Sequence, residues 1–380
     1  MITDVNLRSE FQSRLLNWFE THKRDLPFRK KKPNPYHIFV VEVMLQQTQI
    51  KTVIPYYHRW FKTFSTVESL AQAPIDRVLK LWEGLGYYTR ARNLHKAAKM
   101  IVDEFGGKIP NTVNELMRLP GIGRYTAGAI SSIGFGKPAP IVDGNVARVF
   151  ARLFNVKKDI LNSDTQKYFY ELAAQLVPEK EPGTFNQALM ELGSLVCISE
   201  IPKCEICPVR NLCLAYKNKT QLDLPVRKNK TEIKKIEMVV GIIEKNSRIL
   251  IRKRPPYGIW GGLWEIPGTV RTKGQTPEEA LMQEFQEALG LKIKIQKTLP
   301  QIVHHLTHRN LMIYPYVCLI SEKQKRGQAS SVARMPVPVL RSMPKNTRWA
   351  SQCNLKRFSF PVPHQNILKR CLTQQVVTFR

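Results

Sequence analysis

Apolar residues recur at helical spacing through the first part of the chain. The helical stretches are 8–22, 65–85, 111–121, 163–177 and 184–197. Two of them carry start signals, because Ser65 and Glu68 have the spacing of a capping box and Thr112 with Glu115 repeats it. This period predicts an all-α domain over 1–224.

The pattern changes at 224–235, where five basic residues and a proline replace the apolar spacing. We interpret 225–235 as a basic linker and 236–380 as a second domain. Within this second domain the alternation of residues becomes strand-like and only one clear helical stretch remains. A multi-domain chain with an all-α domain followed by an α+β domain is therefore predicted.

The second domain has its own sequence signals. Residues 236–255 indicate two strands joined by a turn, and 310–320 indicate a further strand. Between them, 276–290 predicts a helix with Thr276 as its N-cap and Glu279 closing a capping box.

The charge balance of the chain favours a polyanionic partner. Lys and Arg number 59 against 30 Asp and Glu, which gives a net charge of +29. Nucleic acid and an anionic membrane both fit this surplus, as does a basic surface without a partner. No apolar run reaches the length of a bilayer span, and the first residues do not form a signal peptide. Nucleic acid is the better prediction.

Four of the seven cysteines lie within 17 residues of each other and form a C-x6-C-x2-C-x5-C pattern. They are Cys197, Cys204, Cys207 and Cys213. Four thiolates this close in sequence suit a [4Fe-4S] cluster or a structural zinc ion, and the alternative is a set of unligated core thiols. The odd number of cysteines argues against a secreted disulfide scaffold and indicates a reducing compartment.

Gly121 and Gly123 flank Ile122 just before a predicted helix that begins near Tyr125. Glycines allow a tight hairpin whose backbone N–H groups point outward, and a helix N-terminus favours an anion. This segment is a candidate phosphate contact, although many turns between helices look similar.

Two carboxylates are candidates for acid chemistry. Glu42 lies in the strongly apolar stretch 35–49, where burial raises the pKa of a carboxyl group and suits it to act as a general acid. A structural carboxylate bonded to a neighbour is the alternative. Asp143 precedes an arginine-rich helical stretch and on its own reads as an N-cap. Together the two are similar to the pair that cleaves a glycosidic bond.

Six ordered motifs make the resemblance specific. They are VEVMLQQTQ, LWEGLGYYTRARNLHKAA, LPGIGRYTAGAI, PIVDGNVARV, FNQALMELG and the four-cysteine loop. The chain resembles the adenine DNA glycosylase (MutY) family of helix-hairpin-helix glycosylases with an iron-sulfur cluster, closely over 8–220 and more loosely beyond. The resemblance implies a [4Fe-4S] cluster at the four cysteines.

The resemblance also implies catalytic roles. Related enzymes such as endonuclease III carry a lysine where this chain has Tyr125, and that amine forms a Schiff base that leads to strand cleavage. A phenol cannot do so, which implies a monofunctional glycosylase. Glu42 would protonate adenine and later activate water, Asp143 would stabilise the positive C1′, and Asn145 and Glu191 would support the site.

Contacts to the flipped base and the duplex follow from the same resemblance. Arg29 and Leu45 would line the base pocket, and Gln47 and Tyr87 would enter the base stack. The chain departs from the family where Phe28 and Phe39 replace tryptophans and Val41 replaces a serine.

The second domain resembles the lesion-reading domain of the family, which is similar to Nudix hydrolases. The run 283–288 lacks the arginine and the last glutamate of the R-E-x-x-x-E-E helix that holds Mg²⁺, which argues against hydrolysis. The stretch HHLTH matches the family's lesion-contacting loop, so Leu306, Thr307 and His308 are candidate contacts to 8-oxoguanine. Ordinary loop residues are the alternative.

We therefore expect an enzyme that excises adenine mispaired with 8-oxoguanine or guanine from double-stranded DNA. We expect it to be a monomer without a membrane partner, located in the cytoplasm, and at the nucleoid if the cell is bacterial. Three alternatives stay open: a bifunctional glycosylase and lyase, a non-catalytic lesion binder and, more weakly, a Nudix hydrolase.

Overall fold

The computed structural model describes residues 4–228, 233–321 and 344–373, so the middle of the predicted linker lies outside the described residues. The chain divides into two compact units. The first unit comprises 1–81 and 89–230, and the second comprises 82–88 and 231–380. Among the described residues, no helix combines the length and apolar character needed to cross a bilayer.

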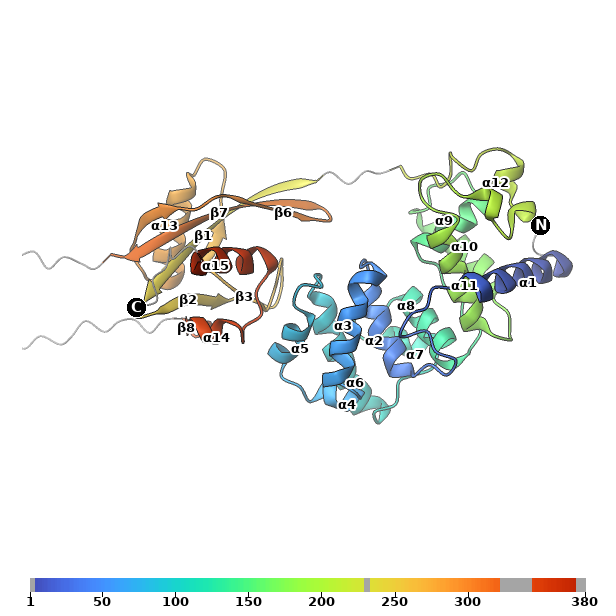
Figure 1. Ribbon diagram of the computed structural model, residues 1–380, viewed down its shortest axis with the longest axis horizontal. Helices are drawn as coiled ribbons and strands as arrows, with labels where there is room; N and C mark the ends of the chain where they lie inside the picture. Colours follow the sequence, from blue (N-terminus) through green and yellow to red (C-terminus); the bar gives the residue numbers. More distant parts are fainter. Residues whose placement is uncertain (1–3, 229–232, 322–343, 374–380) are drawn as a thin grey trace, which may run out of the picture. The chain divides into compact units, whose positions relative to one another are not determined.

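The first unit is built from helices (Figure 1). They are α1 (Val5–His22), α2 (Pro35–Leu45), α3 (Ile50–Thr63), α4 (Val67–Ala71), α5 (Ile75–Trp82), α6 (Thr89–Phe105), α7 (Val113–Arg118), α8 (Arg124–Ala129), the π-helix η1 (Ile130–Gly134), α9 (Gly144–Leu153), α10 (Ser163–Leu176), α11 (Pro182–Leu195), the 3₁₀ turns η2 (Cys204–Ile206) and η3 (Arg210–Leu212), and α12 (Leu214–Lys217). The all-α prediction for this part of the chain is confirmed.

Most of the predicted helix starts are confirmed, and one is wrong by a single residue. The Thr112 side chain accepts a hydrogen bond from the Glu115 N–H at 3.3 Å and so caps α7. The predicted box at 65 and 68 forms one residue later, where Thr66 and Ser69 bond reciprocally to each other's backbone N–H at 3.2 Å. Val67 is the first residue of α4 and is buried, so the N-cap position falls on Thr66.

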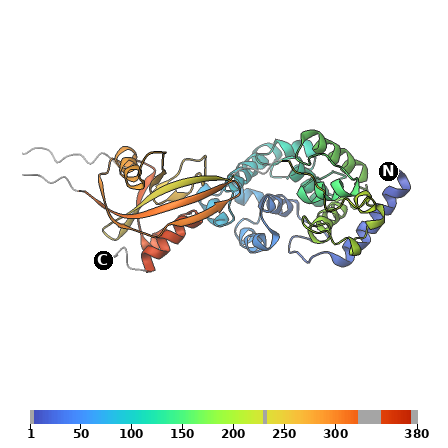
Figure 2. The same cartoon turned by 90° about the horizontal axis from the view of Figure 1, so that it is seen from above.

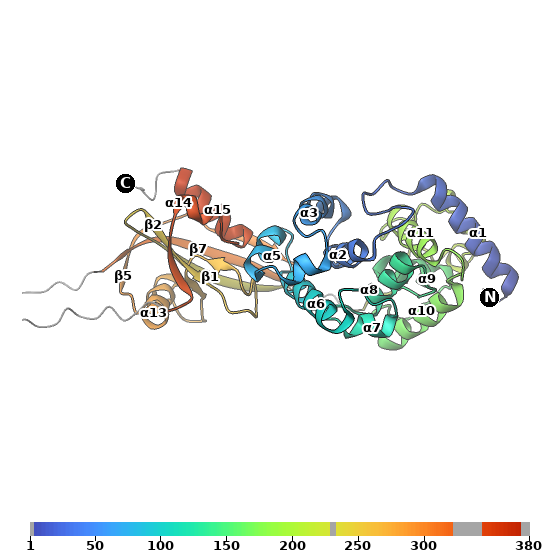
Figure 3. The same cartoon turned by 90° about the horizontal axis from the view of Figure 1, so that it is seen from below.

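One hydrophobic cluster of the first unit lies among α1, α9, α10 and α11. Apolar side chains from all four helices are buried there, including Phe11, Phe150, Phe169 and Phe185. Helix α1 packs along α11, as Figure 3 shows. Because α9 and α11 also pack on each other, residues from 144–153 and 182–195 are fixed side by side.

The second unit holds the strands of the described chain and three helices. Its elements are β1 (Lys234–Lys245), β2 (Arg248–Lys253), β3 (Trp264–Glu265), β4 (Gly268–Val270), α13 (Pro277–Leu289), β5 (Ile293–Thr298), β6 (Ile302–Leu306), β7 (Arg309–Ile320), β8 (Thr347–Ser351), α14 (Gln352–Leu355) and α15 (Val362–Thr373). The predicted α+β composition of this part of the chain is confirmed.

The strands form a mixed sheet with the order β3-β2-β1-β7-β5, to which β4, β6 and β8 add at the sides. β1 and β7 run parallel, and the other strand pairs are antiparallel. The predicted hairpin turn is present between β1 and β2, where Asn246 and Ser247 both have positive φ, as a type I′ turn requires. Within this unit α13 covers one face of the sheet and α15 the other (Figure 2).

The predicted helix start at Thr276 is also confirmed. The Glu279 N–H donates to the Thr276 hydroxyl at 3.2 Å, and the Glu279 carboxylate accepts from the Thr276 N–H at 2.9 Å. The helix then buries Leu281 and Phe285 against the sheet.

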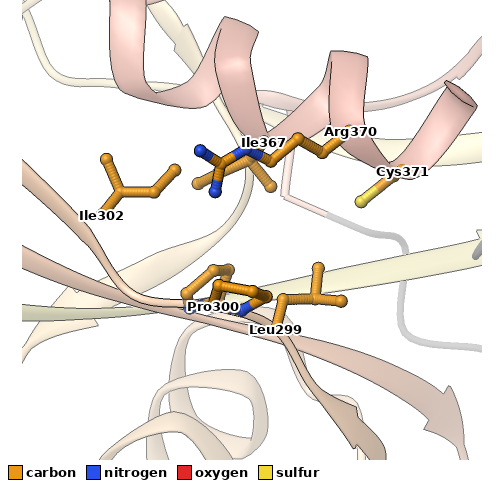
Figure 4. Close-up of a pocket in the computed structure, with 7 residues that line it drawn as sticks. Leu299, Pro300, Ile302, Ile367, Arg370 and Cys371 are labelled. Carbon is orange, nitrogen blue, oxygen red and sulfur yellow. The ribbon is translucent and has the colours of Figure 1, made fainter. Parts of the chain in front are cut away.

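A pocket of about 400 Å³ lies between the sheet and α15 of the second unit (Figure 4). Ile367, Arg370 and Cys371 of α15 form one side, and the segment around Leu299 and Pro300 forms the other. It contains none of the residues that the sequence singled out.

Candidate active site

A pocket of about 180 Å³ opens among α2, α8, α9, α11 and the segment between α1 and α2. It is lined by Arg24, Leu26, Phe28, Arg29, Ile38, Val41, Glu42, Leu45, Thr48, Ile50, Tyr125, Ile133, Asp143, Asn145, Gln187, Met190, Glu191 and Ser194. Both candidate carboxylates of the sequence analysis therefore face one cavity, although they lie far apart in the chain.

Glu42 reaches the pocket from the last turn of α2. This helix begins with Asn34 as N-cap and Pro35 at its first position, and it is buried along most of its length. Glu42 itself is only 5% exposed. Burial raises the pKa of its carboxyl group to about 7, and the nearby Asp143 adds to this rise. Near neutral pH this residue therefore exists in both protonation states.

The Tyr125 hydroxyl contacts Glu42 from the first turn of α8. It donates a hydrogen bond to Glu42 Oε2 at 3.1 Å and also lies 3.2 Å from Met190 Sδ. The bond to Glu42 favours the ionised carboxylate and so opposes part of the effect of burial. Burial raises the pKa of Tyr125 well above its ordinary value, so the phenol keeps its hydrogen.

Asp143 is the N-cap of α9, as its sequence position predicts. It accepts from the Val146 N–H at 2.7 Å and from Asn145 Nδ2 at 2.9 Å. Burial raises the pKa of Asp143, whereas these two donors act in the opposite direction. The cap and the site are compatible, because the donors hold the carboxylate in place while it faces the pocket.

Arg148 fixes Asn145 in turn, and the sequence reasoning missed this residue. It donates to Asn145 Oδ1 at 2.9 Å, to the Gly193 carbonyl at 2.7 Å and to the Cys197 carbonyl at 2.8 Å. The available signal was a pair of arginines four residues apart, Arg148 and Arg152, in an otherwise apolar helix. Hydrogen bonds thus run from the carbonyl of Cys197, the first cysteine of the loop, through Arg148 to the Asn145 amide that bonds Asp143.

Glu191 also lines the pocket, where two arginines hold it. Arg24 donates to it through its backbone N–H and its guanidinium at 2.6 to 2.9 Å, and Arg29 adds bonds at 3.2 and 3.3 Å. These donors outweigh burial and lower the pKa of Glu191 to about 2. Arg29 also donates to Gln187 Oε1 at 2.9 Å. Arg24, Gln187 and Met190 are pocket residues that the sequence reasoning did not single out.

The remaining predicted residues of the first motifs divide into two groups. Leu45 lines the pocket, as does the family departure Phe28, whereas Phe39 is fully buried in the core. Gln47 and Tyr87 are not among the lining residues. Both are exposed, Tyr87 to 43%, and both have positive φ, which is uncommon for residues other than glycine.

The glycine hairpin precedes α8 as predicted. Gly121 has φ +80°, and a Cβ there would also lie 2.8 Å from the Cβ of Asn93, so a larger residue is excluded on both grounds. Gly123 is the N-cap residue of α8. The conformation of this segment therefore depends on glycine at position 121.

The four cysteines of the loop line one small pocket of about 30 Å³, together with Arg152 and Lys203. All four are free thiols, and Arg152 Nη1 lies 3.4 Å from Cys197 Sγ. Among the described residues, no three His, Cys, Asp or Glu side chains form a group that could hold a metal ion.

In the second unit, Leu306 is the last residue of β6, and Thr307 and His308 form the turn to β7. Thr307 and His308 are exposed there. Glu284 of α13 is an acidic residue that this chain keeps from the Nudix helix pattern. It accepts a hydrogen bond from Arg252 Nη1 at 2.5 Å.

The comparisons with known proteins agree with this architecture. The family described as "HhH-GPD superfamily base excision DNA repair protein" matches residues 40–178, and the NUDIX domain family matches 238–370. The solved structure of a thermostable thymine-DNA glycosylase is 32% identical with a TM-score of 0.51, over 56% of this chain and 97% of that one.

Curated relatives extend the similarity over both units. The adenine DNA glycosylase of Buchnera aphidicola subsp. Baizongia pistaciae is 38% identical over 314 residues, which cover 82% of this chain and 87% of that protein. The human adenine DNA glycosylase is 35% identical over 371 residues, with 83% and 68% covered. With identity at this level over most of both chains, the chain belongs to the adenine DNA glycosylase family.

Proposed function

We propose that this enzyme removes adenine mispaired with 8-oxoguanine or guanine from double-stranded DNA, by hydrolysis of the N-glycosidic bond. One observation carries the proposal: a buried, protonatable Glu42 and a hydrogen-bonded Asp143 face the same 180 Å³ pocket. A flipped base needs such an enclosed site, and two carboxyl groups are the usual catalysts of glycoside hydrolysis.

Glu42 supplies the proton. With its pKa near 7, a large fraction of the carboxyl group is protonated at neutral pH, and a general acid works best in that range. Transfer of the proton to a ring nitrogen of adenine makes the base a neutral leaving group. The resulting carboxylate of Glu42 can then take a proton from the attacking water.

Asp143 stabilises the sugar as the bond breaks. Positive charge develops at C1′, and the carboxylate is held in place by Asn145 and by the Val146 N–H. Because Arg148 fixes Asn145, little reorganisation is needed when the charge appears.

The proposed activity ends with base removal. A lyase step requires an amine that attacks C1′ and forms an imine, and the residue at the matching position is Tyr125, whose hydroxyl is bonded to Glu42. We therefore propose a monofunctional glycosylase that leaves an intact strand with an abasic site.

Contacts to the base and the duplex are assigned in the same way. Leu45, Arg29 and Glu191 would contact the adenine, since all three line the pocket. Exposed Gln47 and Tyr87 would enter the base stack. The hairpin containing Gly121 and Gly123 would bind a backbone phosphate.

Recognition of 8-oxoguanine is assigned to the second domain. We propose a catalytic domain over 1–224, a basic linker over 225–235 and a lesion-reading domain over 236–380. Half-buried Leu306 and the exposed Thr307 and His308 would meet the damaged base, with the Thr307 hydroxyl as the hydrogen-bonding group. We further propose that the protein acts as a monomer in the cytoplasm.

The four cysteines would hold a [4Fe-4S] cluster. The four thiols line one pocket, and Arg152 beside Cys197 would offset the negative charge of the thiolates, so the donor set fits the group. Four cysteines are the usual ligand set of a [4Fe-4S] cluster, and a structural zinc ion would take the same set. When bound, the cluster would hold the loop in shape.

A duplex with one adenine opposite 8-oxoguanine tests the proposal. The protein is incubated with the labelled duplex, and each sample is divided between hot alkali and no treatment. We expect strand breakage at the adenine only after alkali, and none with Glu42→Gln. Breakage without alkali would establish a lyase, and tight binding without breakage in either sample would establish a lesion binder.

A further inference from the structure

The hydroxyl of Tyr125 has two acceptors and one hydrogen. Its oxygen lies 3.1 Å from Glu42 Oε2 and 3.2 Å from Met190 Sδ. A phenol can donate its hydrogen fully to one partner at a time, and a thioether sulfur is the weaker acceptor of the two. The direction of this hydrogen therefore depends on the protonation state of Glu42.

Two arrangements follow from these distances. When Glu42 is ionised, the Tyr125 hydrogen points to the carboxylate, because a charged acceptor makes the stronger bond. When Glu42 carries its proton on Oε2, that proton occupies the line to the Tyr125 oxygen. The phenol hydrogen must then turn to another acceptor, and Met190 Sδ is within reach.

We propose that Met190 is a positioning residue for the acid step, because its sulfur accepts the Tyr125 hydrogen whenever Glu42 holds its proton toward Tyr125. The sulfur thereby keeps the protonated acid hydrogen-bonded until the substrate arrives. This inference rests on the proposed role of Glu42 as the general acid.

Met190 lies in α11, lines the same pocket as Glu42 and also packs against the hydrophobic core. A test of its role must therefore separate the hydrogen bond from packing. Leucine has a similar volume and no acceptor. A change to leucine therefore removes the hydrogen bond while largely preserving the packing.

Other charged groups face Glu42 and contribute to its titration. Asp143 at the start of α9 raises its pKa. Glu191 in α11 and the two arginines 24 and 29 line the same pocket as an ion-paired group. A neutral substitution by leucine leaves all of these charges in place, so a change in the titration of Glu42 would report the hydrogen bond.

The test is the pH profile of single-turnover adenine removal in Met190→Leu. Without the sulfur, the Tyr125 hydroxyl keeps donating its hydrogen bond to Glu42, which favours the ionised carboxylate. We expect the alkaline limb of the rate profile to shift to lower pH by about half a unit. The rate should therefore fall roughly threefold above pH 7 and change little well below it. Met44→Leu, a buried methionine of α2 outside the pocket lining, is the matched control and should not shift the limb.

A Tyr125→Phe background separates the hydrogen bond from packing. Met190→Leu should shift the limb only when the hydroxyl is present. An equal loss of rate at every pH, or the same shift in the Tyr125→Phe background, would overturn the inference.

A second readout needs no substrate. The pH dependence of the difference in unfolding free energy between wild type and Glu42→Gln reports the pKa of Glu42, and the same pair is measured with Met190→Leu in both proteins. We expect the pKa to fall by about half a unit. If Met190→Leu lowers the pKa of Glu42 while the wild type removes no adenine, the proposed function is wrong but the inferred hydrogen bond to Met190 is supported. If adenine is removed but neither readout moves, the inference is wrong and the proposed function stands.

Discussion

Gly193 of α11 lies directly against Asn145 of α9. A Cβ on Gly193 would be 2.7 Å from the Cβ of Asn145 and 3.0 Å from its carbonyl oxygen. The glycine thus permits the close helix approach that brings Asn145 to Asp143. We expect Gly193→Ala to destabilise the protein by about 1–3 kcal/mol through overpacking and to reduce adenine removal, as measured by urea unfolding and single-turnover assays.

Gly134→Ala is the control for this substitution. A Cβ at Gly134 would lie no closer than 3.5 Å to another atom, which is ordinary contact. Equal losses in the two variants would show that the approach of α9 and α11 is not the cause.

Glu42→Gln should abolish adenine removal and stabilise the protein at alkaline pH. The folded pKa of Glu42 is about 7 against an ordinary value of 4.5. The stability contributed by its protonated form is therefore present below about pH 4.5 and is lost as the pH rises through 7. Relative to wild type, the variant should gain about 3 kcal/mol above pH 8, and the gain should vanish near pH 4.5. Denaturant unfolding across this range measures the difference, and a constant difference would contradict the buried acid.

Glu191→Gln should destabilise the protein in the opposite pH window. The pKa of Glu191 is lowered from 4.5 to about 2 by Arg24 and Arg29, so its contribution is present above pH 4.5 and is lost as the pH falls toward 2. We expect a loss of about 3 kcal/mol at neutral pH that shrinks below pH 4.5.

The exposed ion pair of Glu104 with Arg118 provides the comparison for Glu191. Its groups lie 2.7 Å apart with about half of each side chain in solvent. Glu104→Gln should cost less than about 1 kcal/mol. Similar costs for the two substitutions would contradict the role of burial.

The second domain should not hydrolyse nucleotides. Arg252 donates to Glu284, the residue that a Nudix helix would offer to Mg²⁺, and also to Glu265 at 2.9 Å. The guanidinium thus occupies oxygen ligands that the cation would need. We expect no Mg²⁺-dependent release of phosphate or pyrophosphate from nucleoside triphosphates, and such release would revive the hydrolase alternative.

The native protein should contain iron and sulfide in equal amounts. A cluster at the four cysteines would give a brown colour with broad absorbance near about 400 nm, and Cys204→Ser should weaken or remove both. Zinc in elemental analysis, without this absorbance, would assign the cysteines to a structural zinc site.

Local chemistry explains what the sequence determined by itself. Helix starts depend on residues three or four positions apart, so the caps at Thr112, Asp143 and Thr276 could be predicted. Ser65 and Thr66 both carry a hydroxyl group that can cap a helix, so the sequence pattern could not distinguish them. The prediction chose Ser65, one residue before the cap in the structure. The absence of a lysine at position 125 is likewise visible without any structure.

The tertiary structure alone decided which distant side chains meet. Tyr125 bonds to Glu42 83 positions away, and Glu191 reaches Arg24 167 positions away. The hydrogen bonds of Arg148 to the cysteine loop also depend on how α9 packs against α11, which a glycine permits. Such contacts follow from the packing of whole helices, to which many residues contribute a little each. The raised pKa of Glu42 could be expected from its apolar stretch, whereas the lowered pKa of Glu191 depends on its contacts with Arg24 and Arg29 and so came only with the fold.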